Sequence, residues 1–303
     1  MAVPMRSTDF RSIVEPILNE TFDGIYDQRS DEWKQVFREF KGTPRAYHEE
    51  PVLFGFGAAP ELPDGAPVTY QNGGVLFIKR YVYKVYGLAF ALTKVLVDDG
   101  DHIRIGSTYA EHLAQSLIET KETLCANILN RAFNGAYLGG DGVALNVTNH
   151  PIAGGTFSNL FTAAAMSQSS VEQGLIQIRN AVDNNGKRIK LMPQQLVSGN
   201  SNVMQAEVII KSVLRTGAAN NDINPIKTMD LLPKGAAILA RITSTTAWWI
   251  QTNAPQGMKM AMRRSLERSM EGDFDTDSMK YKATERYIPG WTDPRALYGT
   301  PGL

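Results

Sequence analysis

The protein has 303 residues, of which 43% are hydrophobic and 20% are charged. This is the composition of a folded globular chain, and the length allows about two domains. Its 31 basic residues are balanced by 31 acidic residues, whereas a protein that mainly grips nucleic-acid phosphates carries an excess of cations. Composition and charge therefore exclude wholesale disorder, and they disfavour strong, sequence-independent nucleic-acid binding as the primary role.

The one cysteine, Cys125, excludes an internal disulfide framework and a zinc site built on several thiolates. A single thiol also fits a reducing compartment. The N-terminus has no apolar core of signal-peptide length, and no window approaches ~18 uninterrupted apolar residues. We therefore expect a soluble protein that is made inside the cell and has no membrane partner.

Two short amphipathic stretches dominate residues 1–48. The first has the three-four spacing of one apolar helix face, which Pro16 starts or kinks. The apolar residues are Phe10, Ile13, Val14, Ile17 and Leu18 in the first stretch and Trp33, Val36, Phe37 and Phe40 in the second. They form either two ordinary helices packed on their own core or an arm whose apolar stripe lies on a neighbouring subunit.

Residues 49–97 combine a Pro/Gly-dense segment, 51–67, with a turn signal at Asn72-Gly73-Gly74 and a β-type run from Val75 to Phe90. Both alternation faces of that run carry apolar side chains, which indicates cover on both sides. A lone two-stranded hairpin is marginal in water. The hairpin therefore either joins a larger sheet of its own chain or is covered by other subunits.

The clearest helix is predicted over Thr108–Asn134. Its start carries a capping box, Thr108 to Glu111, and Gly135 is placed to end it. At 1.5 Å per residue such a helix is roughly 40 Å long. Cys125 lies inside it, where we expect a buried and inert thiol.

The rest of the chain is predicted to mix helices and strands. A connecting loop at Gly139–Gly142 precedes a capped helix that starts at Ser169–Glu172. Residues 189–256 form a separate α/β unit with a strand at Leu196-Val197, a helix and then a hairpin that turns at Ser244-Thr245. The last 45 or so residues alternate short strands and turns.

No motif that supports catalysis is present. The four histidines are scattered, and the chain lacks HExxH, GxSxG and GxxxxGK[ST] patterns. The acidic segment Asp273–Asp277 departs from a calcium loop at Ser278 and Thr284, and a solvated turn is the better interpretation. We expect no catalytic residue, no cofactor and no metal ligand, and hence a protein whose function is its contacts.

The order of segments resembles the major capsid (head) proteins of tailed bacteriophages, which share the Hong Kong 97-type fold. The segments that carry the resemblance are Thr93-Lys94 with Val97–Asp99, Glu119–Glu122, Asn130–Asn134, GGDGVAL (139–145), TNHP (148–151), GGTFSN (154–159), GAANNDINP (217–225), AWWI (247–250), DFDTDSMKYKATERY (273–287) and Gly290–Arg295. The resemblance spans most of the chain after about residue 20 and rests on many weak segments in the right order.

The resemblance implies an α+β chain with a particular layout. It implies an N-terminal arm (1–48), an extended hairpin loop that reaches a neighbour (49–97) and a peripheral domain with a long spine helix at 108–134 (98–188). An axial domain (189–256) and a return to the peripheral domain (257–303) follow. The side chains that we expect at contacts between subunits are Phe77, Lys79, Arg80, Tyr81, Tyr83, Lys84, Asp98, Asp99, Trp33 and Phe37. A lysine crosslink through Lys79 or Lys84, which some members form, is not expected.

The implied function is self-assembly into hexamers and pentamers of an icosahedral head shell. That shell encloses double-stranded DNA without sequence-specific binding and is assembled in the host bacterial cytoplasm. Separate scaffold and portal proteins, with or without a decoration protein, are the expected partners, and we expect no removal of a long N-terminal segment. The alternatives are an encapsulin-like compartment shell and a soluble α/β enzyme with a site around His150 and Asp141.

Overall fold

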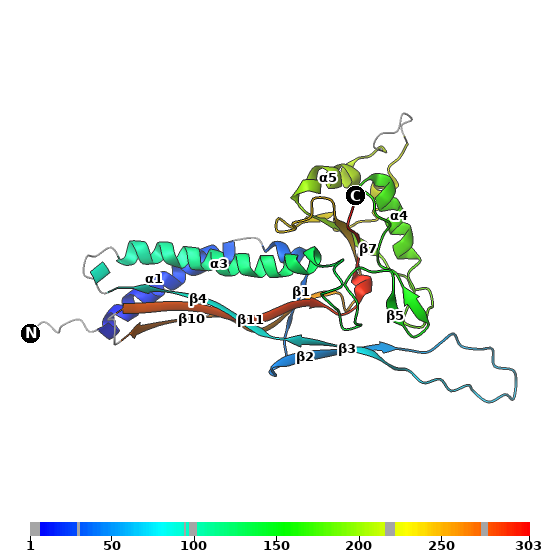
Figure 1. Ribbon diagram of the computed structural model, residues 1–303, viewed down its shortest axis with the longest axis horizontal. Coiled ribbons are helices and arrows are strands. Elements are labelled where there is room, and N and C mark those ends of the chain that lie inside the picture. Colours follow the sequence, from blue (N-terminus) through cyan, green and yellow to red (C-terminus); the bar gives the residue numbers. More distant parts are fainter. Residues whose placement is uncertain (1–6, 29–30, 94, 97–101, 216–221, 274–277) are drawn as a thin grey trace, which may run out of the picture.

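The computed structural model describes residues 7–28, 31–93, 95–96, 102–215, 222–273 and 278–303. The molecule has three parts (Figure 1). A pair of helices lies along a long sheet, a second body with its own sheet stands at one end, and a thin hairpin projects beneath that body. The chain is thus extended, with a large surface for its length.

The long sheet has four strands in the order β1-β10-β11-β4. These are β1 (Arg38–Lys41), β10 (Met258–Asp273), β11 (Ser278–Trp291) and β4 (Lys84–Leu92). Along β11, Tyr281 and Ala283 are buried while Lys280 and Lys282 are exposed. The sheet therefore has one face covered by protein and one polar face.

Two helices cover the apolar face of this sheet, α1 (Ser7–Gln28) and α3 (His102–Asn130). Leu18 and Phe22 of α1 are fully buried in one cluster with Leu113 and Leu117 of α3. The first amphipathic stretch therefore packs on its own subunit. Two residues of the predicted apolar face of this stretch, residues 10 and 13, have side chains outside what the structure describes.

The long helix begins six residues before the predicted start and ends four residues before the predicted end. Thr108 is in its interior, where the hydroxyl donates to the carbonyl of Arg104 at 3.1 Å. The capping-box pattern was misleading because a threonine can satisfy its hydroxyl inside a helix as well as cap one.

The second amphipathic stretch is a short 3-10 helix, η1 (Glu32–Gln35), followed by β1. Trp33 and Phe37 are each 2% exposed and belong to the core between α3 and the two sheets. This corrects the prediction that they contact another subunit: their apolar surface is covered inside their own chain.

The second body is built on a four-stranded sheet in the order β12-β9-β7-β8. Its elements are β5 (His150–Ile152), β6 (Gly155–Phe157), α4 (Gln168–Arg179), β7 (Pro193–Ser198), η2 (Asn200–Asn202), α5 (Val203–Lys211), α6 (Pro225–Thr228), β8 (Ala236–Ile238), β9 (Trp248–Thr252), η3 (Pro294–Ala296) and β12 (Leu297–Thr300). The expected strand at Leu196-Val197 is β7, and a helix follows it as predicted.

Three predictions for this part need correction. β8 and β9 do not form a hairpin, because β7 lies between them and pairs with both. The helix cap is Ser167, whose hydroxyl accepts from the backbone N–H of Ser170. The final residues are not short strands only: β10 and β11 have 16 and 14 residues, and β12 completes the second sheet beside β9.

The projecting hairpin consists of β2 (Tyr47–Phe54) and β3 (Gly74–Val82), joined by the loop 55–73. Asn72-Gly73-Gly74 is the end of that long loop rather than a tight turn. The predicted β-type run is divided at Tyr83, because β3 pairs with β2 while β4 pairs with β11 in the long sheet. Half of the run therefore joins the body and half leaves it.

Candidate assembly surfaces

The root of the hairpin is fixed to the body by a half-buried carboxylate. Glu50 of β2 accepts hydrogen bonds from Lys259 of β10 and from the hydroxyl of Thr292, both at 2.5 Å. Burial alone would raise the pKa of Glu50, but these hydrogen bonds hold that pKa below its usual value. The hairpin therefore leaves the body from a rigid base.

Two tyrosines that we predicted at a subunit interface belong to this base. The Tyr81 hydroxyl lies 2.5 Å from the Thr292 hydroxyl, and its ring is 2% exposed. The Tyr83 hydroxyl accepts from the backbone N–H of Thr43 at 3.0 Å. This corrects the prediction for both residues, since each is covered by its own subunit.

The start of the loop 55–73 is tied to the second body. The side-chain amide of Asn184 donates to the carbonyl of Leu53 at 2.8 Å, and the Lys187 ammonium donates to the carbonyl of Phe56 at 2.6 Å. Asn185 donates to the same carbonyl at 3.0 Å. These contacts direct the loop outward along the side of the body (Figure 1).

Beyond these contacts the hairpin exposes many apolar side chains. Eight large apolar residues of the strands and loop are more than half exposed, and one of them, Tyr70, is 93% exposed. They are Leu53, Phe56, Leu62, Val68, Tyr70, Val75, Ile78 and Val82. An apolar patch of this kind on an otherwise ordinary surface marks a site of protein contact. We call this group the hairpin patch.

The remaining predicted contact residues of this region have different environments. Phe77 is half-buried against the glycine loop, where a Cβ on Gly140 would lie 2.9 Å from its ring. The ammonium of Lys79 lies 5.4 Å from the centre of the Trp291 ring, and burial lowers the pKa of Lys79. Both side chains therefore mainly hold the hairpin to its own body.

The other cations of the hairpin region are exposed. Arg80 pairs with Glu49 of the neighbouring strand at 2.6 Å. Lys84 is exposed at the start of β4 and has no ion pair with the part of the chain that the structure describes. Asp98 and Asp99 lie outside the described residues. Of the predicted contact residues, Arg80 and Lys84 are thus the ones on an open surface.

Two further surfaces were not found from the sequence. β4 is the edge strand of the long sheet, so one row of its backbone groups has no partner strand among the described residues, and Val85 and Leu88 on it are more than half exposed. On the second body, Met204 and Val208 of α5 and Val213 after it are also exposed. The exposed edge of β4, with its apolar side chains, favours pairing with a strand of another chain.

The candidate enzyme site is closed. The structure brings His150 and Asp141 together, with Nδ1 of the imidazole 2.6 Å from a carboxylate oxygen. Both side chains are buried, and Nε2 faces the side-chain oxygen of Asn159 at 3.0 Å. Every hydrogen-bonding atom of the imidazole is therefore occupied by protein, and the pair acts as a structural link between loops.

Nothing else among the described residues indicates catalysis or membrane insertion. No group of three or more metal-ligating side chains is found in those ranges, and none of the helices described is long and apolar enough to cross a bilayer. The thiol of Cys125 is buried, and burial raises its pKa.

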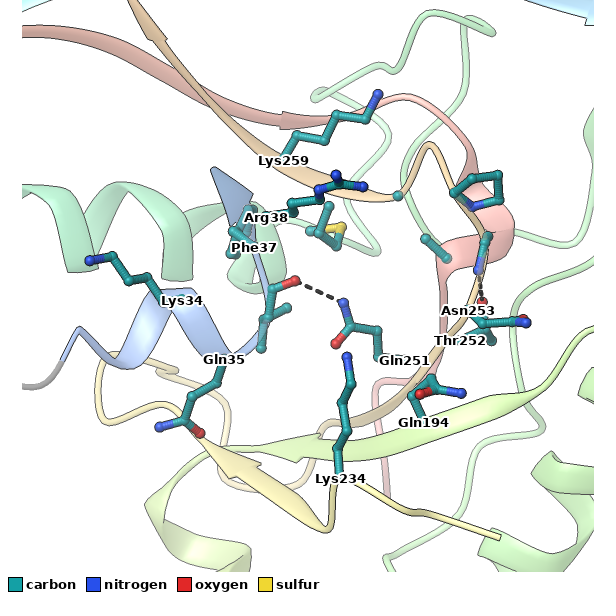
Figure 2. A pocket seen from close by; sticks show the side chains of 16 residues that line it. Lys34, Gln35, Phe37, Arg38, Gln194, Lys234, Gln251, Thr252, Asn253 and Lys259 are labelled. Carbon is teal, nitrogen blue, oxygen red and sulfur yellow. Dashed lines mark hydrogen bonds between the residues drawn. The ribbon is translucent and has the colours of Figure 1, made fainter. Parts of the chain in front are cut away.

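A polar cavity of about 410 Å³ lies where the two sheets meet (Figure 2). Its floor is formed by Gln251 of β9, whose amide donates to the carbonyl of Val36 at 2.8 Å. Gln195 of β7 donates to the neighbouring carbonyl of Gln35 at 2.6 Å. These bonds attach the segment that enters β1 to the second sheet, and lysine and arginine side chains surround them.

Comparison with known proteins identifies this architecture. The phage capsid protein family matches residues 79–299. Among solved structures, the mature capsid of bacteriophage PhiM1 has a TM-score of 0.58 at 10% identity and covers 90% of this chain and 87% of that one. No curated protein sequence matches the chain.

Two other shells are similar. The capsid of the cyanophage P-SCSP1u has a TM-score of 0.54 at 12% identity, with 91% of this chain and 89% of that chain covered. The virus-like particle from Pyrococcus furiosus has a TM-score of 0.53 at 10% identity, with 94% and 98% covered.

The fold is therefore the Hong Kong 97-like fold of shell-forming capsid proteins, as the sequence predicted. The chain belongs to the phage capsid protein family, and it is a structural protein of a phage capsid shell.

Proposed function

We propose that the chain is the major subunit of a closed icosahedral head, in which the hairpin patch of each subunit lies on a neighbouring copy. The observation that carries this proposal is the exposed apolar surface of β2, β3 and the loop 55–73, which projects from a rigid base. No part of a single chain that the structure describes covers it.

The free energy available from this surface is large enough to drive assembly. Fully burying an exposed large apolar side chain contributes about 1.5–3 kcal/mol, and half-exposed side chains contribute about half of that. Eight such side chains on each hairpin therefore exceed the contribution of exposed ion pairs such as those available to Arg80 and Lys84, about 0–1 kcal/mol each. Repetition around rotation axes closes the shell.

We propose the following layout of the subunit. The segment 47–82 is the extended loop, the long sheet with α1 and α3 is the peripheral domain, and the sheet β12-β9-β7-β8 with α4 and α5 is the axial domain. In this arrangement the exposed residues of α5, Met204 and Val208, surround the axes of hexamers and pentamers. The edge of β4 is a second contact.

We extend the proposal to the partners of the shell. The shell encloses double-stranded DNA without reading the DNA sequence. The equal numbers of acidic and basic residues agree with this, because the chain has no excess of cations that would bind the phosphates tightly. Scaffold and portal proteins, with or without a decoration protein, are separate chains, and assembly takes place in the bacterial cytoplasm. The chain has no enzymatic activity of its own, in keeping with the closed environment of His150.

Deletion of the loop tests this function. The wild-type protein should form shells, tubes or capsomers of megadalton size by light scattering and negative-stain microscopy. A variant in which residues 58–70 are replaced by a short glycine-serine linker should keep its circular dichroism and unfolding transition but remain a small species. A folded loop-deleted variant that assembles like wild type would refute the role of the hairpin patch.

Neither alternative function is favoured. A compartment shell has the same fold, and it would contain a cargo peptide instead of DNA in purified particles. An enzyme would act as a small oligomer with turnover, and its candidate pair, His150 and Asp141, is inaccessible to a substrate.

A further inference from the structure

The cavity between the two sheets has an unusual charge. Its lining includes four cations, Lys34, Arg38, Lys234 and Lys259, and no carboxylate. In the whole chain, basic and acidic residues are equal in number. The excess of cations in the lining therefore reflects where these side chains lie in the fold and not the composition of the chain. It makes the cavity a region of positive potential.

Two of the four cations already have acidic partners outside the lining. Lys34 pairs with Asp31 at 2.5 Å, and Lys259 pairs with Glu50 at the root of the hairpin. Arg38 and Lys234 are exposed and have no ion pair with any residue in the described ranges. Positive charge that the protein itself does not neutralise is thus concentrated on these two side chains.

The two unpaired cations come from different sheets. Arg38 begins β1 of the long sheet, and Lys234 precedes β8 of the second sheet. Figure 2 shows Lys234 extending from one side of the cavity toward Gln251, with Arg38 on the opposite side. An anion placed between them would contact both sheets at once, at the point where Gln251 already joins them.

We propose that this cavity binds a phosphate group of a polyanion, through Arg38 on one side and Lys234 on the other. Phosphate fits this geometry because its oxygens point in several directions and can accept from donors on opposite sides. The guanidinium of arginine matches two of those oxygens, and lysine supplies a point charge. The cavity volume is within the usual range for small-ligand sites. This inference does not depend on the proposed shell.

Calorimetric titration of the full-length protein with sodium triphosphate tests the proposal. Wild type should bind saturably, and Arg38→Gln and Lys234→Gln should each weaken binding about tenfold, since each removes a charge-assisted hydrogen bond. Both side chains are exposed, so the variants should unfold at the wild-type temperature. The matched control is Lys211→Gln with Arg215→Gln, which removes one lysine and one arginine outside the cavity; its affinity should stay within about twofold of wild type.

Competition then identifies the source of the phosphate. If a short DNA duplex displaces triphosphate from wild type, the site holds the nucleic-acid backbone; if it does not, the site holds a free polyphosphate, and both outcomes support the cavity. The proposal is overturned if wild type shows no saturable binding. It is also overturned if the control variant loses as much affinity as the cavity variants, because the attraction would then be a property of the whole surface.

Discussion

The ammonium of Lys121 lies 3.1 Å from the carboxylate of Glu285, inside the contact between α3 and β11. Both side chains are less than a tenth exposed. The Tyr26 hydroxyl of α1 donates to the same carboxylate and accepts from the ammonium at 2.6 Å. Burial and the negative charge of Glu285 raise the pKa of Tyr26, so the hydroxyl stays protonated. One ion pair thus joins both helices to the sheet.

Replacing Lys121 by methionine should destabilise the subunit by about 3–5 kcal/mol, because a buried carboxylate would lose its partner. Urea unfolding of the dissociated subunit measures this. The control Lys280→Met removes an exposed lysine of β11, the strand that carries Glu285, and should cost about 1 kcal/mol or less. The double variant Lys121→Met/Glu285→Leu also removes the carboxylate, so it should be more stable than Lys121→Met alone. If it is not, the loss of stability in Lys121→Met has a cause other than the unpaired charge.

Glu122 should make the stability depend on pH. Burial, helped by the negative charge of Glu32, raises the pKa of Glu122 to about 7 from its usual 4.5. The folded chain therefore binds more protons than the unfolded chain between these values, and the stability falls as pH rises through this window. Glu122→Gln should stabilise the protein by about 1–3 kcal/mol at pH 8.

The same substitution should have little effect at the acid end, because both states of the wild type are then protonated at this position. Unfolding curves of wild type and Glu122→Gln, taken from acid to alkaline pH, give the difference directly. A difference that is independent of pH would show that Glu122 does not titrate in this range.

Trp33→Ala should destabilise the isolated subunit by about 3–5 kcal/mol, since it empties a fully covered position in the main core. The measurement is denaturant unfolding under conditions that keep the subunit dissociated. Met204→Ala, at an exposed position of α5, should change that stability by no more than about 0.5 kcal/mol. If Trp33→Ala left the unfolding free energy of the subunit unchanged but weakened assembly, Trp33 would instead lie at an interface between subunits.

Polar substitutions in the hairpin patch should separate folding from assembly. Leu62→Ser with Tyr70→Ser should leave the unfolding free energy within about 0.5 kcal/mol of wild type, because both side chains are exposed in the subunit. The concentration needed for assembly, measured by light scattering, should rise at least tenfold. Thr69→Ser on the same loop is the control, and an equal effect of that change would contradict a role for apolar burial.

Elements with local periodicity could be predicted from the sequence. The repeat of apolar residues along α3 and the strand-then-helix pattern at β7 and α5 are decided by residues near one another in the chain. β10 and β11 were predicted only as short strands, because their open face is polar and their outer neighbours, β1 and β4, lie far earlier in the sequence. Even the buried face includes Glu285, whose partner Lys121 comes from a helix far earlier in the sequence.

The predicted contact residues show where sequence reasoning ends. An apolar side chain such as Trp33 or Phe37 must be covered, but its pattern does not say whether the cover is its own chain or another. The structure assigned both to the core, while Arg80 and Lys84 stayed on the surface. The cavity was invisible because Arg38 and Lys234 are brought together only by the joining of two sheets.

The order of strands has a consequence for synthesis on the ribosome. The long sheet needs β10 and β11 between β1 and β4, and the second sheet needs β12 beside β9. All three of these strands begin at or after Met258, so neither sheet can close around its core until that part of the chain has left the ribosome. Products truncated before Met258 therefore lack the packed bodies from which a particle could be built.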